Sequence, residues 1–160
     1  MLNYQEQFNN ASSTGRQVLI LKAVGVCDCY DEDDLLNSEP MPSCEKCFGT
    51  GKMRLQIKTE KIRYEITNNS ASSHLEEINY SKDTHELYSF YFPGHYHYIN
   101  NDDIIIVYDE QGKPSKAFEV LNKENFVKDD FVFYEVFGKK VSYFNMEVFN
   151  ERSWEIYKSI

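Results

Sequence analysis

The chain has 160 residues, of which 41% are hydrophobic, and a formal net charge of -9. This length suits a single domain with one core. The acidic balance argues against nucleic-acid binding through phosphate contacts, because no basic stripe is present to displace counterions. The 12 tyrosines and 11 phenylalanines favour strands over helices, since aromatic side chains fit pleated, half-buried surfaces.

Residues 1–15 are polar and rich in Asn and Ser, and they contain neither a basic segment nor an apolar stretch. They show no secretory signal and are predicted to form a flexible arm. The longest apolar stretch, Val18 to Val26, is interrupted by Lys22 and is too short to cross a bilayer. No membrane association is expected, and the protein is expected to be made in a reducing cytoplasm.

Residues 16–59 are predicted to contain a strand, a loop and a second strand. The run from Gln17 to Val26 is typical of a buried strand and leads directly into Cys27. An acidic, proline-containing loop follows, and a loop of this length inside a compact domain requires an anchor. After it, Met53, Leu55 and Ile57 alternate with polar residues, which is the pattern of a half-buried strand.

Residues 60–149 are predicted to form a β-barrel built as a meander. A second alternation, at Ile62, Tyr64 and Ile66, follows the polar pair Glu60 and Lys61. Further short strands are expected at Leu87 to Phe92, Ile104 to Tyr108, Ala117 to Leu121, Phe131 to Phe137 and Val141 to Phe144. Their spacing and turn signals favour a small antiparallel barrel or sandwich. Residues 150–160 form a C-terminal segment that the pattern leaves open between helix and strand.

The four cysteines fall into two close pairs. Cys27-x-Cys29 is followed after fourteen residues by Cys44-x-x-Cys47, a spacing that predicts one zinc ion bound by four thiolates in a tetrahedron. Gly49 and Gly51 permit the positive φ angles that such a knuckle needs. The alternatives are two disulfides, a redox pair or unrelated buried cysteines, and the reducing compartment argues against disulfides. A closed four-sulfur site leaves no open position for water, so its role is structural.

Two further features are candidates for sites. His95 and His97 would lie on one face of an extended segment and could bind a second metal, although a packing role is the simpler reading. An aromatic run surrounds them, and alternation places only part of it in a core. The candidate interface residues are Tyr88, Phe90, Tyr91, Phe92, Tyr96 and Tyr98. No motif for a catalytic nucleophile or a phosphate loop is present, so no enzymatic activity is expected.

The cysteine motif carries two resemblances. The string CEKCFGTG, from Cys44 to Gly51, resembles one half-repeat of the cysteine-rich region of J-domain co-chaperones, although the chain has a single copy and no J-domain. CxC, a loop and CxxCxGTG more closely resemble a group of tailed-bacteriophage virion proteins, the head–tail connector (neck or head-closure) proteins. The stretch from Asn100 to Val141 is also similar to that group's barrel, with Asp102-Asp103 where the group has Gly-Asp.

This second resemblance implies a function in assembly. It implies a non-enzymatic virion protein, made in the host cytoplasm, that forms a homo-oligomeric ring between portal or adaptor proteins and the tail. DNA would pass nearby without specific binding. The alternatives are a zinc-binding protein–protein adaptor outside a neck ring, or a metal-dependent enzyme using His95 and His97.

Overall fold

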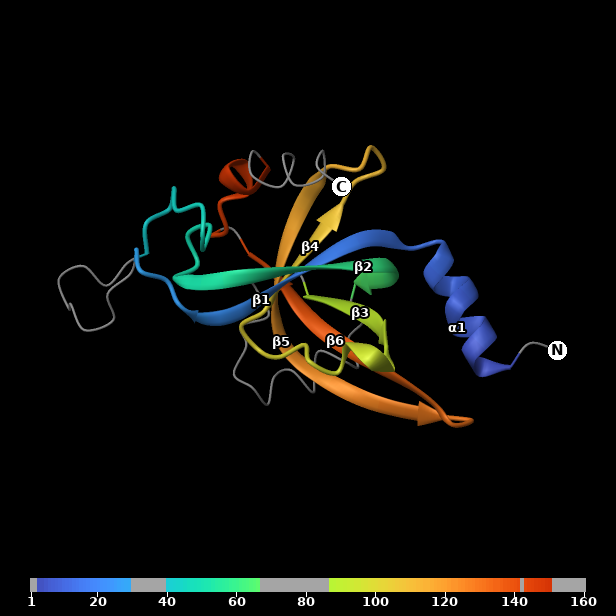
Figure 1. Cartoon of the computed structure of the whole chain (residues 1–160). Coiled ribbons are helices and arrows are strands. Elements are labelled where there is room, and N and C mark those ends of the chain that lie inside the picture. Colours follow the sequence, from blue (N-terminus) through green and yellow to red (C-terminus); the bar gives the residue numbers. More distant parts are fainter. Residues whose placement is uncertain (1–2, 30–39, 67–86, 142, 151–160) are drawn as a thin grey trace.

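A computed structural model of the chain describes residues 3–29, 40–66, 87–141 and 143–150. Its elements are α1 (Tyr4–Ser13), β1 (Arg16–Val26), β2 (Lys52–Ile66), β3 (Leu87–Pro93), the 3-10 helix η1 (Gly94–Tyr96), β4 (Ile104–Tyr108), β5 (Pro114–Lys128) and β6 (Phe131–Lys140). The strands form a closed antiparallel barrel in the order β1-β2-β3-β6-β5-β4 (Figure 1). The predicted mainly-β fold is confirmed, and the barrel is chosen over the sandwich.

Residues 18–21 of β1 and all of β4 are continuous apolar runs because both of their faces are covered. Val18 and Ile20 of β1 point into the barrel, and Leu19 and Leu21 point outward into a second apolar cluster. The barrel interior receives side chains from all six strands. Its buried residues are Val18, Ile20, Ile62, Tyr88, Phe90, Phe92, Tyr96, Ile99, Ile105, Val107, Phe118, Val120 and Val136. Continuous burial on two faces removes the period-2 alternation of a one-sided strand.

The chain order around the barrel differs from the predicted meander. β1, β2 and β3 follow one another, but β3 pairs with β6, and closure comes from the pairing of β4 with β1. The residues from Gly94 to Asp103 therefore cross from one side of the barrel to the other. Ile99, in the middle of this crossing segment, is fully buried in the barrel interior. β1 and β2 belong to the barrel, so the barrel begins at residue 16 and not at residue 60 as predicted.

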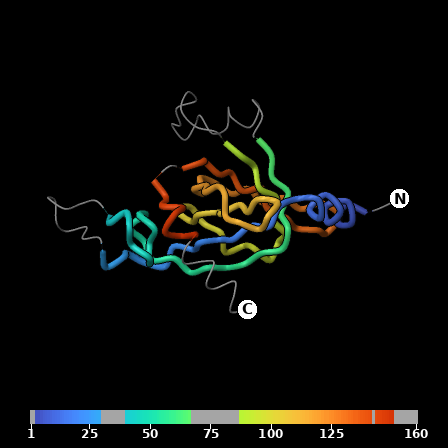
Figure 2. The backbone as a smooth tube through the Cα atoms, turned by 90° about the horizontal axis from the view of Figure 1, so that it is seen from above, coloured from blue at the N-terminus to red at the C-terminus, as the bar shows by residue number. Residues whose placement is uncertain are grey.

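The arm predicted for residues 1–15 is wrong over residues 4–13, which form α1. The helix begins at a capping box in which Asn3 accepts from the Glu6 amide at 2.8 Å and Glu6 accepts from the Asn3 amide at 3.2 Å. Phe8 is buried and contacts Phe131 and Phe133 of β6, with ring centroids 5.1 and 5.2 Å apart. The helix thus covers the far part of the β5–β6 hairpin, and it lies at the opposite end of β1 from residues 40–51 (Figures 1 and 2).

Three strand boundaries also differ from expectation. β2 runs as one strand through Glu60 and Lys61, which separate the two predicted alternating stretches. It has a bulge opposite Gln17 and Leu19. β5 continues to Lys128 because residues 122–128 pair with β6 alone. The strand predicted for Val141 to Phe144 is not formed by the described residues of that range, Val141, Tyr143 and Phe144. Phe144 instead belongs to a bend, and residues 146–150 are helical. The remainder of the predicted C-terminal segment lies outside the described residues.

Candidate metal centre

The four cysteines lie together at the end of the β1–β2 ribbon. All four Sγ atoms are within 4.8 Å of one another. The short separations join one member of each sequence pair, 3.6 Å from Cys27 to Cys44 and 3.4 Å from Cys29 to Cys47. A tetrahedron of sulfurs at about 2.3 Å from a metal ion has edges of about 3.8 Å. The cluster therefore has the size and the donor set of a four-thiolate metal centre.

These sulfur–sulfur distances are those of separate thiols and not of disulfide bonds. A disulfide needs its sulfur atoms about 2.05 Å apart, and all four cysteines are free in this structure. The two closest sulfur pairs would have to approach by more than an ångström to form bonds. The alternative of two disulfides is therefore not the arrangement that the fold provides, and neither is a scatter of unrelated cysteines.

Strand pairing positions the first cysteine pair. β1 ends at Val26, opposite Lys52 of β2, and the Cys27 amide donates to the Gly51 carbonyl at 2.8 Å. This bond extends the ladder by one step, so that Cys27 is held directly beside the start of β2. Cys27 is fully buried, and Cys29 is partly exposed.

A tight turn positions the second pair. The Phe48 amide donates to the Cys44 carbonyl at 2.9 Å, and the Thr50 amide donates to the Cys47 carbonyl at 3.0 Å. Gly49 and Gly51 have φ angles of 86° and 84°, as the sequence predicts. A Cβ at Gly49 would also lie 3.1 Å from the Tyr143 carbonyl oxygen. Glycine is required there by both conformation and space.

Phe48 anchors the turn to the outer apolar cluster. Its ring contacts those of Phe144 and Phe149, with centroids 5.5 and 5.2 Å apart, and the Asn145 amide donates to the Phe48 carbonyl at 2.8 Å. The Asn145 side chain also donates to the Pro42 carbonyl at 2.7 Å. Sequence reasoning missed this support, because the residues that supply it lie a hundred positions further along the chain.

The local environment treats the thiols differently. Burial raises the pKa of Cys27 and of Cys29. Burial also acts to raise the pKa of Cys44, but hydrogen bonds from the backbone amides of Lys46 and Cys47 outweigh it and lower the pKa to about 7. Amides that point at a sulfur stabilise the thiolate, which is the form that binds metal. The backbone of the knuckle therefore favours the thiolate form of Cys44.

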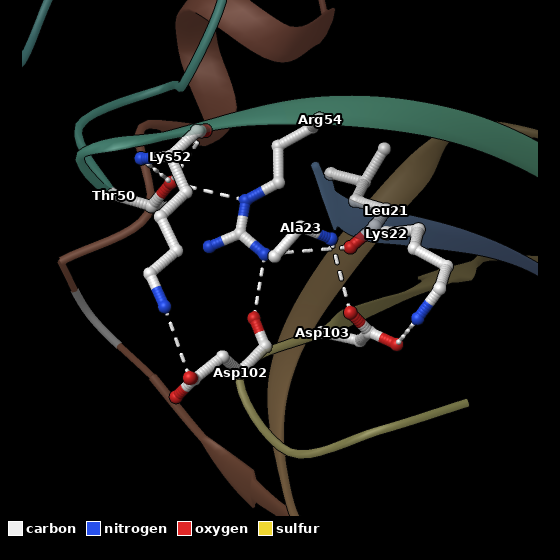
Figure 3. Close-up of polar contacts among 8 residues, drawn as sticks. All are labelled: Leu21, Lys22, Ala23, Thr50, Lys52, Arg54, Asp102 and Asp103. Atoms are coloured by element: carbon white, nitrogen blue, oxygen red, sulfur yellow. Dashed lines mark hydrogen bonds and ion pairs between the residues drawn. The ribbon is translucent and has the colours of Figure 1, made fainter. Parts of the chain in front are cut away.

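Charges around the cluster are paired at the surface. Lys46 lies 2.7 Å from Asp28 in an exposed ion pair, and this lysine lowers the pKa of the Asp28 carboxyl. Deeper in, Arg54 donates to the Thr50 hydroxyl at 3.1 Å (Figure 3). Apart from its place in an alternating strand, no feature of the sequence singles out Arg54.

The histidine candidates do not form a second cluster. His95 lies in η1 and His97 follows it, so the segment is a turn and the predicted extended conformation is wrong. His95 lies 3.8 Å from Glu60, and the His97 carbonyl accepts from Lys123. Among the described residues, the cysteine cluster is the group of three or more ligand side chains close enough to share a metal ion.

The aromatic run is mainly core, which corrects the predicted interface. Tyr88, Phe90, Phe92 and Tyr96 are buried in the barrel interior. Tyr98 is partly buried against the same cluster. Tyr91 is half-exposed, donates to Glu65 at 2.8 Å and lies 4.1 Å below the Arg63 guanidinium. Two of the six residues therefore retain surface for a partner.

Two comparisons with known proteins found no match. No protein-family model matches the sequence, and no curated protein is detectably similar to it. None of the helices in the described part of the chain has the length and apolar character needed to span a membrane.

Proposed function

We propose that this protein is a structural component of a tailed-bacteriophage virion, a connector or neck-ring subunit at the head–tail junction whose cysteines bind one structural zinc ion. The observation that carries the proposal is the four-cysteine cluster at the end of a two-stranded ribbon of a small closed barrel. CxC after the first strand and CxxCxGTG before the second is the chain order of the connector proteins that the sequence resembles.

The departure at Asp102 is sterically compatible with that resemblance. Asp102 has a φ of 75°, in the left-handed region that glycine favours and aspartate tolerates better than most residues. Asp103 is buried and accepts from the Ala23 and Asn100 amides at 3.0 and 2.8 Å. Aspartate in place of glycine thus keeps the same turn ahead of β4.

The donor set favours zinc in a structural role. Four cysteine thiolates in a compact cluster suit zinc or iron–sulfur chemistry, and a single tetrahedral ion takes up all four sulfurs. With no position left for water or substrate, the ion would fasten residues 40–51 to the β1–β2 ribbon. Structural zinc in finger peptides contributes on the order of 10 kcal/mol to folding.

The surface beside the cluster supports a role in protein contacts. Val24, Val26, Met53 and Leu55 expose 53%, 45%, 38% and 54% of their surface. They lie on the two paired strands that lead to the cluster, and exposed apolar side chains at such a place are available for contact with another protein. They suit a ring of identical subunits that binds portal and tail proteins, and they equally favour the second candidate, a zinc-binding adaptor outside a neck ring. The net charge of -9 suits a channel past which DNA moves without binding.

Metal analysis tests the zinc site. The purified protein is expected to contain one zinc per chain, and Cys44→Ser to lose both the metal and much of its thermal stability, with Ser43→Ala as the matched control. Absence of zinc from the wild-type protein overturns the metal assignment.

Assembly separates the two candidate functions. Incubated with assembled portals or examined in the native particle, a connector is expected to appear as a closed ring at the portal vertex. A protein that never joins portals or virions, but binds another partner at one-to-one stoichiometry, supports the adaptor and overturns the connector.

A further inference from the structure

Arg54 of β2 joins three parts of the molecule at the metal end of the barrel. Its Nε donates to the Thr50 hydroxyl at 3.1 Å, and its Nη1 donates to the carbonyl oxygens of Leu21 and Asp102, at 3.4 Å and 2.5 Å (Figure 3). One planar side chain thus ties residues 40–51 to β1 and to the turn before β4. The rigid fork of a guanidinium suits such a three-way contact, which an ammonium group cannot reproduce.

Thr50 connects Arg54 to the backbone of Cys47, one of the candidate metal ligands. The Thr50 hydroxyl donates to the Cys47 carbonyl at 2.7 Å, and the Thr50 amide donates to the same oxygen. The hydroxyl therefore accepts from Arg54 and donates to the backbone of Cys47. Only this one side chain separates the guanidinium from a residue that carries a metal-binding sulfur.

The charge of Arg54 has no carboxylate partner of its own. Among the described residues it forms no ion pair, and the nearby carboxylates are held by lysines, Asp102 by Lys52 at 3.0 Å and Asp103 by Lys22 at 3.1 Å. Burial lowers the pKa of Arg54, while the charges of Tyr143, Asp103, Asp102 and Cys47 act to raise it. A half-buried cation next to neutral oxygens is costly unless a negative charge lies close by.

A tetrathiolate zinc centre supplies such a charge. Four thiolates carry four negative charges and the ion carries two positive ones, so the complete centre has a net charge of -2. We propose that Arg54 is a positioning residue of the metal centre, which fixes the Cys47 turn through Thr50 and provides a partly buried positive charge that offsets part of the net negative charge of the centre. This inference rests on the proposed zinc site.

Zinc affinity in matched variants tests the role. Arg54→Gln removes the charge and the fork, and Arg54→Lys keeps the charge alone. Arg16→Gln is the matched control, because it removes an exposed arginine at the opposite end of β1 that is already paired with Glu110. Zinc is titrated against a chelator of known affinity, and far-UV circular dichroism of the zinc-loaded protein checks that each variant is folded. Cobalt substitution adds the sulfur-to-metal charge-transfer band as a spectroscopic signature of the thiolates.

The expected order of affinities follows from the two parts of the role. Loss of outer contacts around metal ligands weakens binding by about 10–100-fold, and Arg54→Gln is expected in that range. Arg54→Lys is expected to recover part of the loss, and Arg16→Gln to bind like the wild type. The cobalt band of Arg54→Gln is expected at longer wavelength, because a thiolate with no cation nearby is more easily oxidised.

The outcomes distinguish this inference from the zinc assignment. A wild-type protein without zinc overturns both. A wild-type protein that binds zinc, with Arg54→Gln binding equally well and an unmoved cobalt band, overturns the positioning role alone. If Arg54→Gln does not fold, Thr50→Val decides, because it removes only the hydroxyl link. Weaker zinc binding by that variant supports the inference, and unchanged binding overturns it.

Discussion

Asp103 offers a direct measure of what a buried carboxylate does for this barrel. Its side chain is 2% exposed and lies 3.1 Å from the Lys22 ammonium, which is 22% exposed. It also accepts from the amides of Ala23 and Asn100. Asp103→Ala would leave two backbone donors without this acceptor, each costing about 1–3 kcal/mol, and a lysine without its partner.

The expected loss is therefore large for a protein of this size. Removing one partner of a buried pair costs about 3–5 kcal/mol, against a total stability of about 5–15 kcal/mol for a typical domain. Asp103→Asn keeps one acceptor oxygen and is expected to lose less. The assay is urea unfolding of the metal-loaded protein at pH 7, followed by far-UV circular dichroism and compared at equal m-values.

The matched control is an ion pair of similar length at the surface. Arg16 and Glu110 lie 2.9 Å apart with side chains 42% and 79% exposed. Because exposed pairs contribute little, Glu110→Ala is expected to leave the unfolding midpoint nearly unchanged. If Asp103→Ala proves no more destabilising than Glu110→Ala, the reasoning from burial and hydrogen bonding is refuted.

Three further changes test other parts of the fold. Phe90→Ala, at a fully buried position, is expected to lower the free energy of unfolding by about 3–5 kcal/mol; unchanged stability with lost assembly would restore the interface interpretation. Gly49→Ala is expected to destabilise more than Gly112→Ala in thermal unfolding, because both have positive φ but a Cβ at Gly112 meets nothing within 4 Å; the reverse order would contradict the crowding by Tyr143. Burial, and secondarily the charges of Glu124 and Glu65, raise the pKa of Glu135. The folded protein therefore binds this proton more tightly than the unfolded chain does, and the stabilisation is lost as pH rises through the folded pKa. Glu135→Gln is thus expected to be more stable than the wild type at pH 7, with the two converging near pH 4; a constant difference across that range would contradict the assignment.

Local patterns were sufficient to predict β4 and the clustering of the cysteines. The limits of β4 match the sequence expectation at both ends, because five consecutive apolar residues between turn signals leave little freedom. The cysteine spacing also predicted a cluster, because β1 and β2 are adjacent along the chain and pair directly. The capping box at Asn3 and Glu6 was present in the sequence and would have predicted α1.

Features that depend on distant segments were not predictable. Alternation along β3 could not decide whether Tyr88 and its neighbours belong to the core or to an interface. The chain crossing after β3, in which Tyr96 and Ile99 are buried, cannot be predicted from the local sequence. Residues 122–128 are too polar to be recognised as a strand from the sequence. They form a strand because they pair with β6. Arg54 gives no signal in the sequence because its three acceptors lie on separate segments.

The contact of Phe48 with Phe144 and Phe149 has a consequence for the order of events during synthesis. The four cysteines are all made within the first 47 residues, so a ribosome-bound chain can bind metal early. The two rings that support the turn appear about a hundred residues later, and at about 5–20 residues per second this is a delay of several seconds. Until then, Phe48 lacks the rings that bury it. The metal knuckle can thus form first, but its attachment to the barrel is completed among the last contacts to form.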